Sequence, residues 1–205
     1  MRVAAVILAA GGSARTAGEN KLLFPQPGEG GPVIAALCRN VMAARFRPVV
    51  IVTGYQASRI RKALEQLPVE TVHNGRWKEG MSSSIRAGVN KIGKRCDGVG
   101  IVPADMPRLT AGTLTLLRDR FESLGGRHIV YPTFRGTQGN PVIFPRRFFP
   151  HMMRVTGDRG CKGILRTHQK DTVAVSVPSE EILLDYDTVS EYRKLGGQIG
   201  ERGDG

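Results

Sequence analysis

A short apolar segment that opens into a loop of small residues constrains this chain more than any other feature. Residues 3–8 form an uninterrupted apolar run, VAAVIL, of the length expected for a buried β-strand. The run ends in five small residues, Ala9, Ala10, Gly11, Gly12 and Ser13. Small residues allow backbone N–H groups to approach an anion closely. The segment therefore predicts a strand that ends in an anion-binding loop.

Two cations follow this loop, Arg15 and Lys21, and both are placed to close over a bound polyphosphate. Two familiar phosphate-binding patterns do not fit. A Walker loop needs Lys directly after its last Gly, but Gly18 is followed by Glu19. The three-glycine pattern of dinucleotide-binding proteins is also absent. The alternative to a polyphosphate loop is an ordinary flexible loop of an α/β protein.

Strands and helices are predicted to alternate along most of the chain. Further buried strands are predicted at residues 48–53, 69–73, 98–103, 128–132, 141–144 and 172–177, with helical periodicity between most of them. A turn is predicted at residues 136–140, and short helices are predicted at residues 146–154, 158–168 and 189–195. This alternation indicates an α/β fold with a mainly parallel sheet and helices on both faces. We expect a single domain over residues 1–195, and a flexible, Gly-rich polar tail over residues 196–205.

The charge balance limits the possible partners. With 30 basic and 18 acidic residues, the formal net charge is +12, which favours anionic ligands or an acidic protein. The basic residues are dispersed and match no nucleic-acid-binding module, so we expect no nucleic acid partner. No apolar run approaches the ~20 residues of a membrane span, and no signal-peptide pattern is present. We therefore expect a cytoplasmic protein without a membrane association.

The cysteines and histidines argue against a disulfide framework or a zinc site. The three cysteines and four histidines are scattered and have neither disulfide-framework nor metal-ligand spacing. We expect the cysteines to be reduced and structural.

Carboxylates offer a better metal site. Asp105 follows the predicted strand 98–103, and ligands of open α/β sheets bind at the carboxyl ends of the strands. A carboxylate that faces a phosphate is a natural ligand for a hard cation. The alternative role is a turn or a helix cap, although Thr110 is already placed to cap the next helix. Asp185 and Asp187 alternate along an extended segment, so both point to one side and can complete the site.

Three further polar segments have two possible roles each. Ser82, Ser83 or Ser84 is predicted to cap a helix, and the same hydroxyls can bind a phosphate or a base. The segment 157–160 (GDRG) is either a helix start capped by Asp158 or a polar loop over the substrate. The third segment, a stiff corner, consists of Gly139, Asn140 and Pro141.

Several of these segments, in this order, resemble one family. They are LAAGGSARTAGENK, HNGRWKEGMSSSIRAG, VPADMP and QGNPVIFP, followed by GDRG and DYDT. They resemble the molybdenum-cofactor nucleotidyltransferases of the nucleoside-triphosphate-transferase superfamily, and in particular their cytidylyltransferase branch. The opening LAAG is similar to that branch, whereas the guanylyl branch typically has LAGG. One residue more lies between Arg15 and Gly18 than in the usual family loop.

The resemblance implies a Rossmann-like three-layer sandwich that uses Mg²⁺ to transfer CMP from CTP to molybdopterin or its molybdenum cofactor. It implies catalytic roles for Lys21, Asp105 and Arg15, and metal binding by Asp105 and Asp187. The implied nucleotide-binding residues are Ala9, Ala10, Gly11, Gly12, Ser13, Arg15, Lys21 and Ser82. The implied acceptor-binding residues are Gly139, Asn140, Pro141 and Asp158. An acidic molybdoenzyme is a further expected partner.

Four alternatives stay open at this point. The donor can be GTP or ATP, and the acceptor can be a sugar phosphate or an isoprenoid phosphate. An NAD(P)-dependent reductase is a third possibility, although the dinucleotide pattern is missing. The fourth is a non-catalytic chaperone that binds the molybdenum cofactor.

Overall fold

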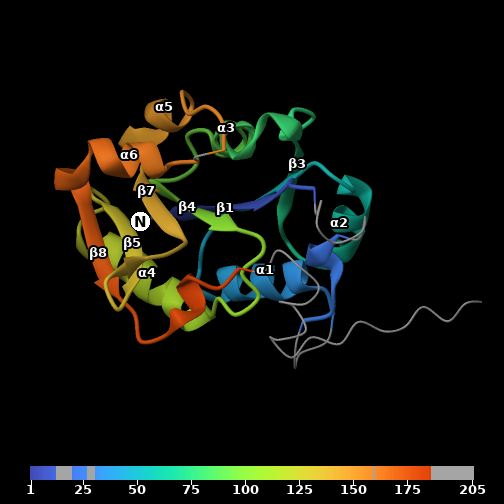
Figure 1. Cartoon of the computed structure of the whole chain (residues 1–205), viewed down its shortest axis with the longest axis horizontal. Helices are drawn as coiled ribbons and strands as arrows, with labels where there is room; N and C mark the ends of the chain where they lie inside the picture. Colours follow the sequence, from blue (N-terminus) through green and yellow to red (C-terminus); the bar gives the residue numbers. More distant parts are fainter. Residues whose placement is uncertain (13–19, 27–30, 159, 186–205) are drawn as a thin grey trace, which may run out of the picture.

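The computed structural model of the chain describes residues 1–12, 20–26, 31–158 and 160–185. An eight-stranded sheet runs through its centre in the order β3-β2-β1-β4-β7-β5-β6, with β8 beside β5 (Figure 1). The strands are β1 (Val3–Ala9), β2 (Val49–Thr53), β3 (Glu70–His73), β4 (Gly98–Pro103), β5 (Ile129–Phe134), β6 (Thr137–Gln138), β7 (Val142–Pro145) and β8 (Thr172–Ser176).

The sheet is mainly parallel, as predicted. Strand β1 pairs in parallel with β2 and β4, β2 with β3, and β5 with β8. Strand β7 is antiparallel to both β4 and β5, and β6 is antiparallel to β5. The carboxyl ends of β1 to β5 and β8 therefore meet at one edge of the sheet, and their amino ends meet at the other.

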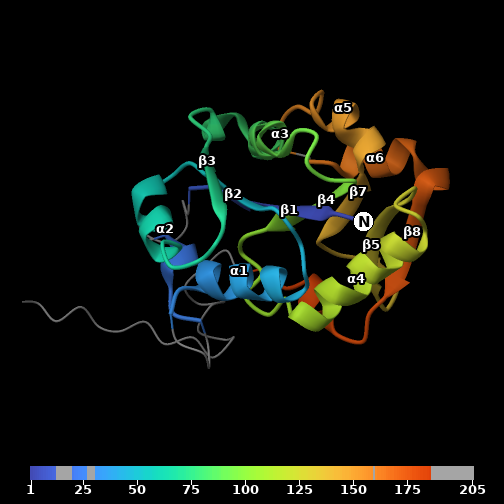
Figure 2. The same ribbon diagram turned by 180° about the vertical axis from the view of Figure 1, so that it is seen from behind.

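Helices cover both faces of the sheet (Figures 1 and 2). One face carries α1 (Val33–Ala43), α2 (Ala57–Ala63) and α4 (Ala111–Ser123). The other face carries α3 (Met81–Ile92), α5 (Phe149–Met152) and α6 (Lys162–Thr167). Five short 3-10 helices complete the described elements: η1 (Lys21–Leu23), η2 (Trp77–Glu79), η3 (Arg146–Phe148), η4 (Gln169–Asp171) and η5 (Glu180–Ile182). This arrangement confirms the predicted three-layer α/β fold.

Strand β1 explains why the chain begins with an apolar run rather than an alternating one. Val3, Ala5 and Ile7 pack into the core beneath α1 and α4. Ala4 and Val6 pack into the core on the opposite face, beneath α3. A parallel strand that is buried on both faces needs apolar side chains at every position.

Three local predictions differ from the structure. The helix predicted over residues 146–154 is the 3-10 helix η3 followed by the single turn of α5, and the helix predicted from residue 158 begins at Lys162. Strand β6 forms inside the predicted turn at residues 136–140. The turn there is tighter than expected, because Arg135 and Gly136 both have positive φ, at 48° and 80°, and join β5 to β6 as a hairpin. The predicted last helix (residues 189–195) and the tail (196–205) lie outside the described residues.

The three cysteines are free and buried, in agreement with the prediction of structural thiols. Burial raises the pKa of Cys38 and of Cys161 to about 12, which keeps both groups protonated at neutral pH. Within the described residues, no helix is long and apolar enough to cross a membrane.

Candidate active site

The carboxyl ends of β1 and β4 lie side by side and bring two predicted site segments together. The register pairs Leu8 with Pro103, so the loop after β1 faces the turn after β4. The backbone N–H of Ala104 also donates to the carbonyl oxygen of Leu8 at 3.3 Å. Gly11 and Gly12 follow the first strand, and Asp105 follows the second.

Lys21 and Asp105 form an ion pair across this junction. The Nζ atom of Lys21 donates to Oδ2 of Asp105 at 2.9 Å, and the two side chains are 12% and 27% exposed. Lys21 begins η1, whose start is fixed by Asn20, because Oδ1 of Asn20 accepts from the N–H of Leu22 at 3.1 Å. The ammonium group is thus presented by a capped turn next to the glycines.

A pocket of about 220 Å³ surrounds the pair. It is lined by Leu8, Gly11, Gly12, Lys21, Leu22, Ala104 and Asp105. Four of these residues, Gly11, Gly12, Lys21 and Asp105, were predicted as site residues from the sequence. A pocket that combines exposed glycine backbone, an ammonium and a carboxylate suits a phosphate together with a cation.

The other residues predicted to bind the nucleotide are placed differently. Ala9 and Ala10 are buried, at 0% and 2% exposure, and do not line the pocket. Ser13 and Arg15 lie outside the described residues, as does the extra residue between Arg15 and Gly18. Asp187, the second predicted metal ligand, also lies outside them. In the described part of the chain, no group of three or more His, Cys, Asp or Glu side chains is placed to hold a metal ion.

A wall of aromatic side chains beside the glycine loop was not predicted. The rings of Trp77 and Tyr55 lie 5.9 Å apart. A Cβ atom at Gly12 would lie 3.1 Å from the Trp77 ring, and one at Gly54 would lie 2.7 Å from it. A glycine at position 12 therefore has two roles: it leaves room for the Trp77 ring, and it leaves the backbone accessible to a ligand. Trp77 is the only tryptophan of the chain and lies shortly before the serine-rich helix. This position is the signal in the sequence that could have identified it as a site residue.

We expect Gly54→Ala to disturb this wall. The new methyl group would meet both the Trp77 side chain and the carbonyl oxygen of Ala10, each at 2.7 Å. Overpacking of this kind costs roughly 1–3 kcal/mol of unfolding free energy. Chemical denaturation measures the loss, and the emission spectrum of the single tryptophan reports the displacement of its ring.

The matched control is Gly163→Ala, because nothing lies within 4 Å of a Cβ atom at Gly163. This variant should keep or slightly raise the stability and leave the emission unchanged. Equal stability and equal emission for Gly54→Ala and the wild type would contradict the packing role of Gly54.

The serines at the start of α3 hold the preceding loop rather than cap the helix, which corrects the prediction. Gly80 is the N-cap residue, and no side chain of its own caps the helix. The Nδ2 group of Asn74 donates to Oγ of Ser83 at 2.8 Å and to Oγ of Ser84 at 3.0 Å. Ser83 Oγ in turn lies 2.9 Å from the carbonyl oxygen of Gly80. Ser82 is buried, and its backbone N–H donates to the carbonyl oxygen of Gly157 at 3.2 Å.

Asp158 is a helix cap, but for a helix distant in sequence. Its Oδ1 accepts from the N–H of Met81, the first residue of α3, at 3.1 Å. Of the two alternatives for this segment, the one in which Asp158 caps the helix that follows it is wrong, because α6 begins at Lys162 after the N-cap residue Cys161. The segment at residues 157–158 therefore covers the N-terminus of α3.

The corner at residues 139–141 holds the C-terminal segment. The N–H of Asn140 donates to the carbonyl oxygen of Ile182 at 3.0 Å, and Gly139 is buried against Ile182. The peptide bond between Asn140 and Pro141 is cis.

Glu181, which was not predicted as a site residue, adds a second anchor for the C-terminal segment. It is 6% exposed, and its Oε1 accepts from Oγ1 of Thr110 at 2.9 Å. Thr110 also caps α4 as predicted, because its Oγ1 accepts from the N–H of Thr113 at 3.2 Å. The C-terminal segment is thus fixed to the turn that follows Asp105.

Comparisons with known proteins agree with this geometry. Residues 5–173 match the family model described as the MobA-like NTP transferase domain. The purine catabolism protein PucB of Bacillus subtilis (strain 168) is 27% identical over 197 residues, which cover 91% of this chain and 92% of PucB.

Solved structures show the same fold. Rv0371c from Mycobacterium tuberculosis H37Rv superposes with a TM-score of 0.81 at 26% identity, covering 95% of this chain and 97% of that protein. A complex of Rv0371c with manganese superposes with a TM-score of 0.76. The CTP:phosphocholine cytidylyltransferase LicC from Streptococcus pneumoniae has a TM-score of 0.68 at 15% identity, over 95% of this chain and 98% of LicC, and shares the fold. Because the family model covers most of the sheet and the pocket with Lys21 and Asp105, the chain belongs to the MobA-like NTP transferase family.

Proposed function

We propose that this protein transfers CMP from CTP to the terminal phosphate of molybdopterin or its molybdenum cofactor and releases pyrophosphate. The observation that carries the proposal is the Lys21–Asp105 pair in the pocket beside Gly11 and Gly12. The pair supplies a cation for the triphosphate and a carboxylate for a metal ion within one small volume.

The reaction needs positioning and charge neutralisation rather than a protein nucleophile. An oxygen of the acceptor phosphate attacks the α-phosphorus of CTP in line. A new P–O bond forms, the bond between the α-phosphorus and the bridging oxygen breaks, and pyrophosphate leaves with the electron pair. The attacking phosphate is already ionised at neutral pH, so no general base is required. Lys21 stabilises the negative charge on the α-phosphate and on the departing pyrophosphate.

Asp105 suits Mg²⁺, because its carboxylate is a hard oxygen donor that remains partly exposed in the pocket. We propose that Asp105 and Asp187 hold the ion, which would supply charge neutralisation on the triphosphate. The anchor of Glu181 on Thr110 supports this set, because it fixes the chain shortly before Asp187 to the turn after Asp105. The anchor of Ile182 on Asn140 holds the same segment to the corner at residues 139–141. The manganese complex of Rv0371c supports a divalent metal in this family.

Lys21 and Asp105 neutralise each other when no substrate is bound. Binding of the metal-nucleotide complex would replace their mutual contact by two stronger ones, ammonium to phosphate and carboxylate to metal. A preformed pair of opposite charges keeps both groups close to their working positions at little cost.

Three observations support CTP as the donor. The opening LAAG of the glycine loop, with Ala10, is similar to the cytidylyl branch. LicC is a CTP-dependent cytidylyltransferase of the same fold, and a CMP-2-keto-3-deoxy-manno-octonic acid synthetase with CTP bound shares the fold with a TM-score of 0.73. Arg15, Ser13 and Ser82 are proposed to complete the nucleotide site. The backbone of Ala9 and Ala10 is proposed to contact the base and the ribose of the nucleotide.

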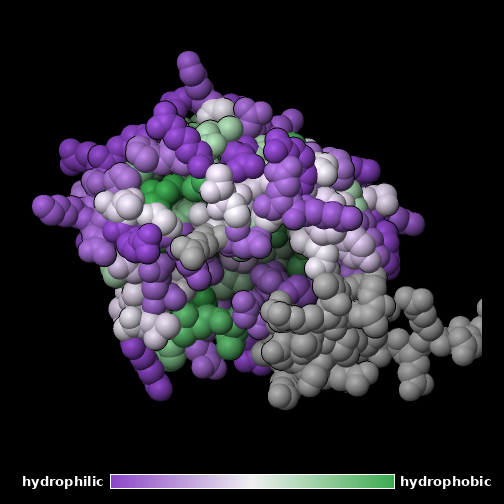
Figure 3. Space-filling view, turned by 45° about the horizontal axis from the view of Figure 1, so that its top comes forward, coloured by the Kyte–Doolittle hydropathy of each residue, from purple (hydrophilic) through white to green (hydrophobic). Residues whose placement is uncertain are grey.

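The acceptor is proposed to lie toward Gly139, Asn140, Pro141 and Asp158. An acidic molybdoenzyme is proposed as the protein partner, and the net charge of +12 supports it. Figure 3 shows hydrophilic side chains spread over most of one face, with hydrophobic residues in smaller patches. The relative PucB is named for purine catabolism, which leaves a different acceptor as the alternative.

Release of pyrophosphate from CTP, GTP and ATP, measured with Mg²⁺ in the presence and absence of molybdopterin, tests the proposal. We expect release from CTP only, and only when molybdopterin is present. Chelation of the metal with EDTA should abolish it. Release from GTP would reassign the donor, release with another phosphorylated acceptor would reassign the acceptor, and release from none of the three would refute nucleotidyl transfer.

A further inference from the structure

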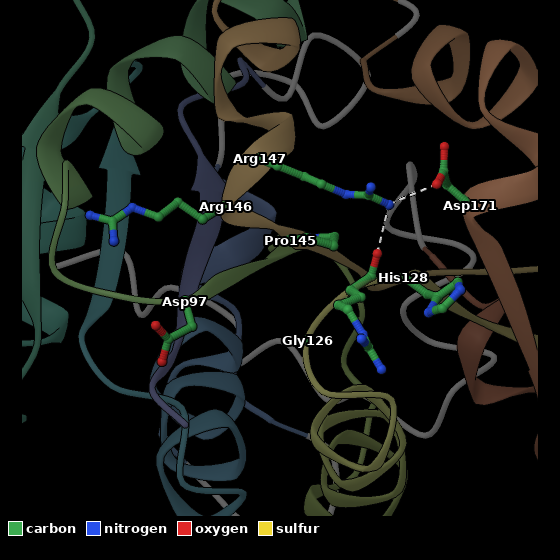
Figure 4. A pocket seen from close by; sticks show the side chains of 8 residues that line it. Asp97, Gly126, His128, Pro145, Arg146, Arg147 and Asp171 are labelled. Carbon is green, nitrogen blue, oxygen red and sulfur yellow. Dashed lines mark hydrogen bonds and ion pairs between the residues drawn. The ribbon is translucent and has the colours of Figure 1, made fainter.

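A second pocket, of about 590 Å³, lies at the opposite edge of the sheet (Figure 4). Its polar lining consists of Arg127, Arg146, Arg147, His128, Asp97 and Asp171. Asp97 directly precedes β4, His128 precedes β5, and Asp171 precedes β8, so these residues mark the amino ends of the strands. Lys21 and Asp105 lie at the carboxyl ends. The two pockets are therefore separate.

Two of the arginines are held in place. Arg147 donates through Nη2 to the carbonyl oxygen of Arg127 and to Oδ1 of Asp171, both at 2.7 Å. Its guanidinium also lies 4.8 Å from the centre of the Phe148 ring. Arg146 donates through Nη2 to the carbonyl oxygen of Lys94 at 2.8 Å and extends away from Arg147 on the other side of Pro145 (Figure 4). Side chains that are already ordered lose little entropy when they bind a ligand.

The arginines retain unused hydrogen-bond donors. A guanidinium carries five N–H groups, and Arg146 and Arg147 each use only Nη2 within the described part of the chain. Arg127 is exposed and forms no side-chain hydrogen bond with any described residue. His128 adds a buried Nδ1 atom that has no hydrogen-bond partner among the described residues. The free N–H groups of the arginines suit a ligand rich in acceptor oxygens.

The charge of the lining is positive. The lining contains three guanidinium groups and two carboxylates, and both carboxylates already accept hydrogen bonds. Asp171 is paired with Arg147, and Oδ2 of Asp97 accepts from the backbone N–H of Arg2 at 2.8 Å. The excess charge and the open donors both favour an anion.

We propose that this pocket binds a phosphate-bearing small molecule at a site distinct from the nucleotide pocket. The planar fork of a guanidinium matches two phosphate oxygens, and a phosphate monoester carries enough charge for more than one arginine. The volume falls in the roughly 300–1,000 Å³ range of small-ligand sites, which leaves room for a group beyond the phosphate. The inference concerns binding only and holds whichever donor and acceptor the active site uses.

Titration with inorganic phosphate and with glycerol 3-phosphate, followed by two-dimensional NMR of the ¹⁵N-labelled protein at low salt, tests the site. We expect saturable shifts of the backbone amide signals of residues 126–128 and 146–147 with both probes. Arg127→Ala should weaken binding about tenfold, because it removes one charged hydrogen-bonding group and no side-chain hydrogen bond to a described residue is lost.

One further variant separates charge from geometry, and another serves as a control. Arg147→Lys keeps the charge but loses the fork, and should weaken binding while the protein stays folded. Arg61→Ala removes an exposed arginine of α2 and should leave the affinity unchanged.

Lys21→Met distinguishes the two pockets. The phosphate-induced shifts at residues 126–128 should persist in this variant, whatever becomes of nucleotide transfer. Shifts confined to the loop around Lys21, or equal affinity in the wild type and Arg127→Ala, would overturn the proposal. Tighter binding of a short oligonucleotide than of glycerol 3-phosphate would replace it by an extended polyanion surface.

Discussion

Asp105→Asn should lower the rate of nucleotidyl transfer by about 10²–10³-fold, the scale found when a group that stabilises transition-state charge is removed. The amide has nearly the shape of the carboxylate but no charge, so the proposed metal ligand is lost while the turn after β4 keeps its form. The defect should appear in kcat. The apparent requirement for Mg²⁺ should shift to higher concentration, because the site then binds the ion more weakly.

Asp119→Asn is the matched control for this substitution. Asp119 lies on α4 with a side chain that is 57% exposed, and it is paired with Arg118. Its loss should leave the rate and the Mg²⁺ dependence unchanged. Near-normal turnover by Asp105→Asn would remove Asp105 from the proposed metal site, and a shared loss in both variants would indicate a general defect of folding.

Lys21→Met should cause the second large loss, again of about 10²–10³-fold in kcat. The methionine retains the apolar stem of the side chain and loses the ammonium that faces Asp105. Lys21→Arg should recover only part of the rate, because a planar guanidinium does not reproduce a compact point charge. Lys62→Met, an exposed position on α2, is the control and should retain full activity.

Measurements of the unfolding free energy distinguish a catalytic defect from a folding defect in the Lys21 and Asp105 variants. The two side chains are only 12% and 27% exposed, so removing one partner costs more than the roughly 0–1 kcal/mol of an exposed ion pair, and the unfolding free energy of each variant is measured beside its rate. If Lys21 and Asp105 act in the same step, the double variant should lose much less than the product of the two single losses. Strictly multiplicative losses would contradict a joint role. Full activity of Lys21→Met would exclude the lysine from the reaction.

Local patterns in the sequence predicted the elements that build the site. The apolar run at β1 predicted a buried strand, which the structure shows to be buried on both faces, and Thr110 was predicted and found as the cap of α4. The position of Asp105 after β4 predicted its place at the carboxyl edge of the sheet. These predictions succeed because strand burial and helix capping depend on residues that are close in the chain.

Contacts between distant segments were not predictable in the same way. The position of Asp158 is typical of a cap for the helix that follows it. In the structure it caps α3 instead, at Met81, which lies 77 residues earlier in the chain. Glu181 lies in an ordinary polar segment, yet it is buried against Thr110, 71 residues away. Trp77 shows no local reason to touch Gly12, and its role depends on how the loops after β1 and β3 meet. The chemistry of a side chain indicates what kind of partner it needs, but only the fold determines which residue becomes that partner.

By itself, the sequence determined the α/β alternation, the small-residue loop after β1 and the carboxylate that follows β4, since each depends on periodicity or on neighbouring residues. The tertiary structure decided that Lys21 meets Asp105 across 84 residues, and that Arg127 and Arg147 share a pocket at the far edge of the sheet. Both outcomes depend on strand order and direction. Strand order and direction follow from the need to bury both faces of the whole sheet at once. The sequence of a single segment does not contain this information.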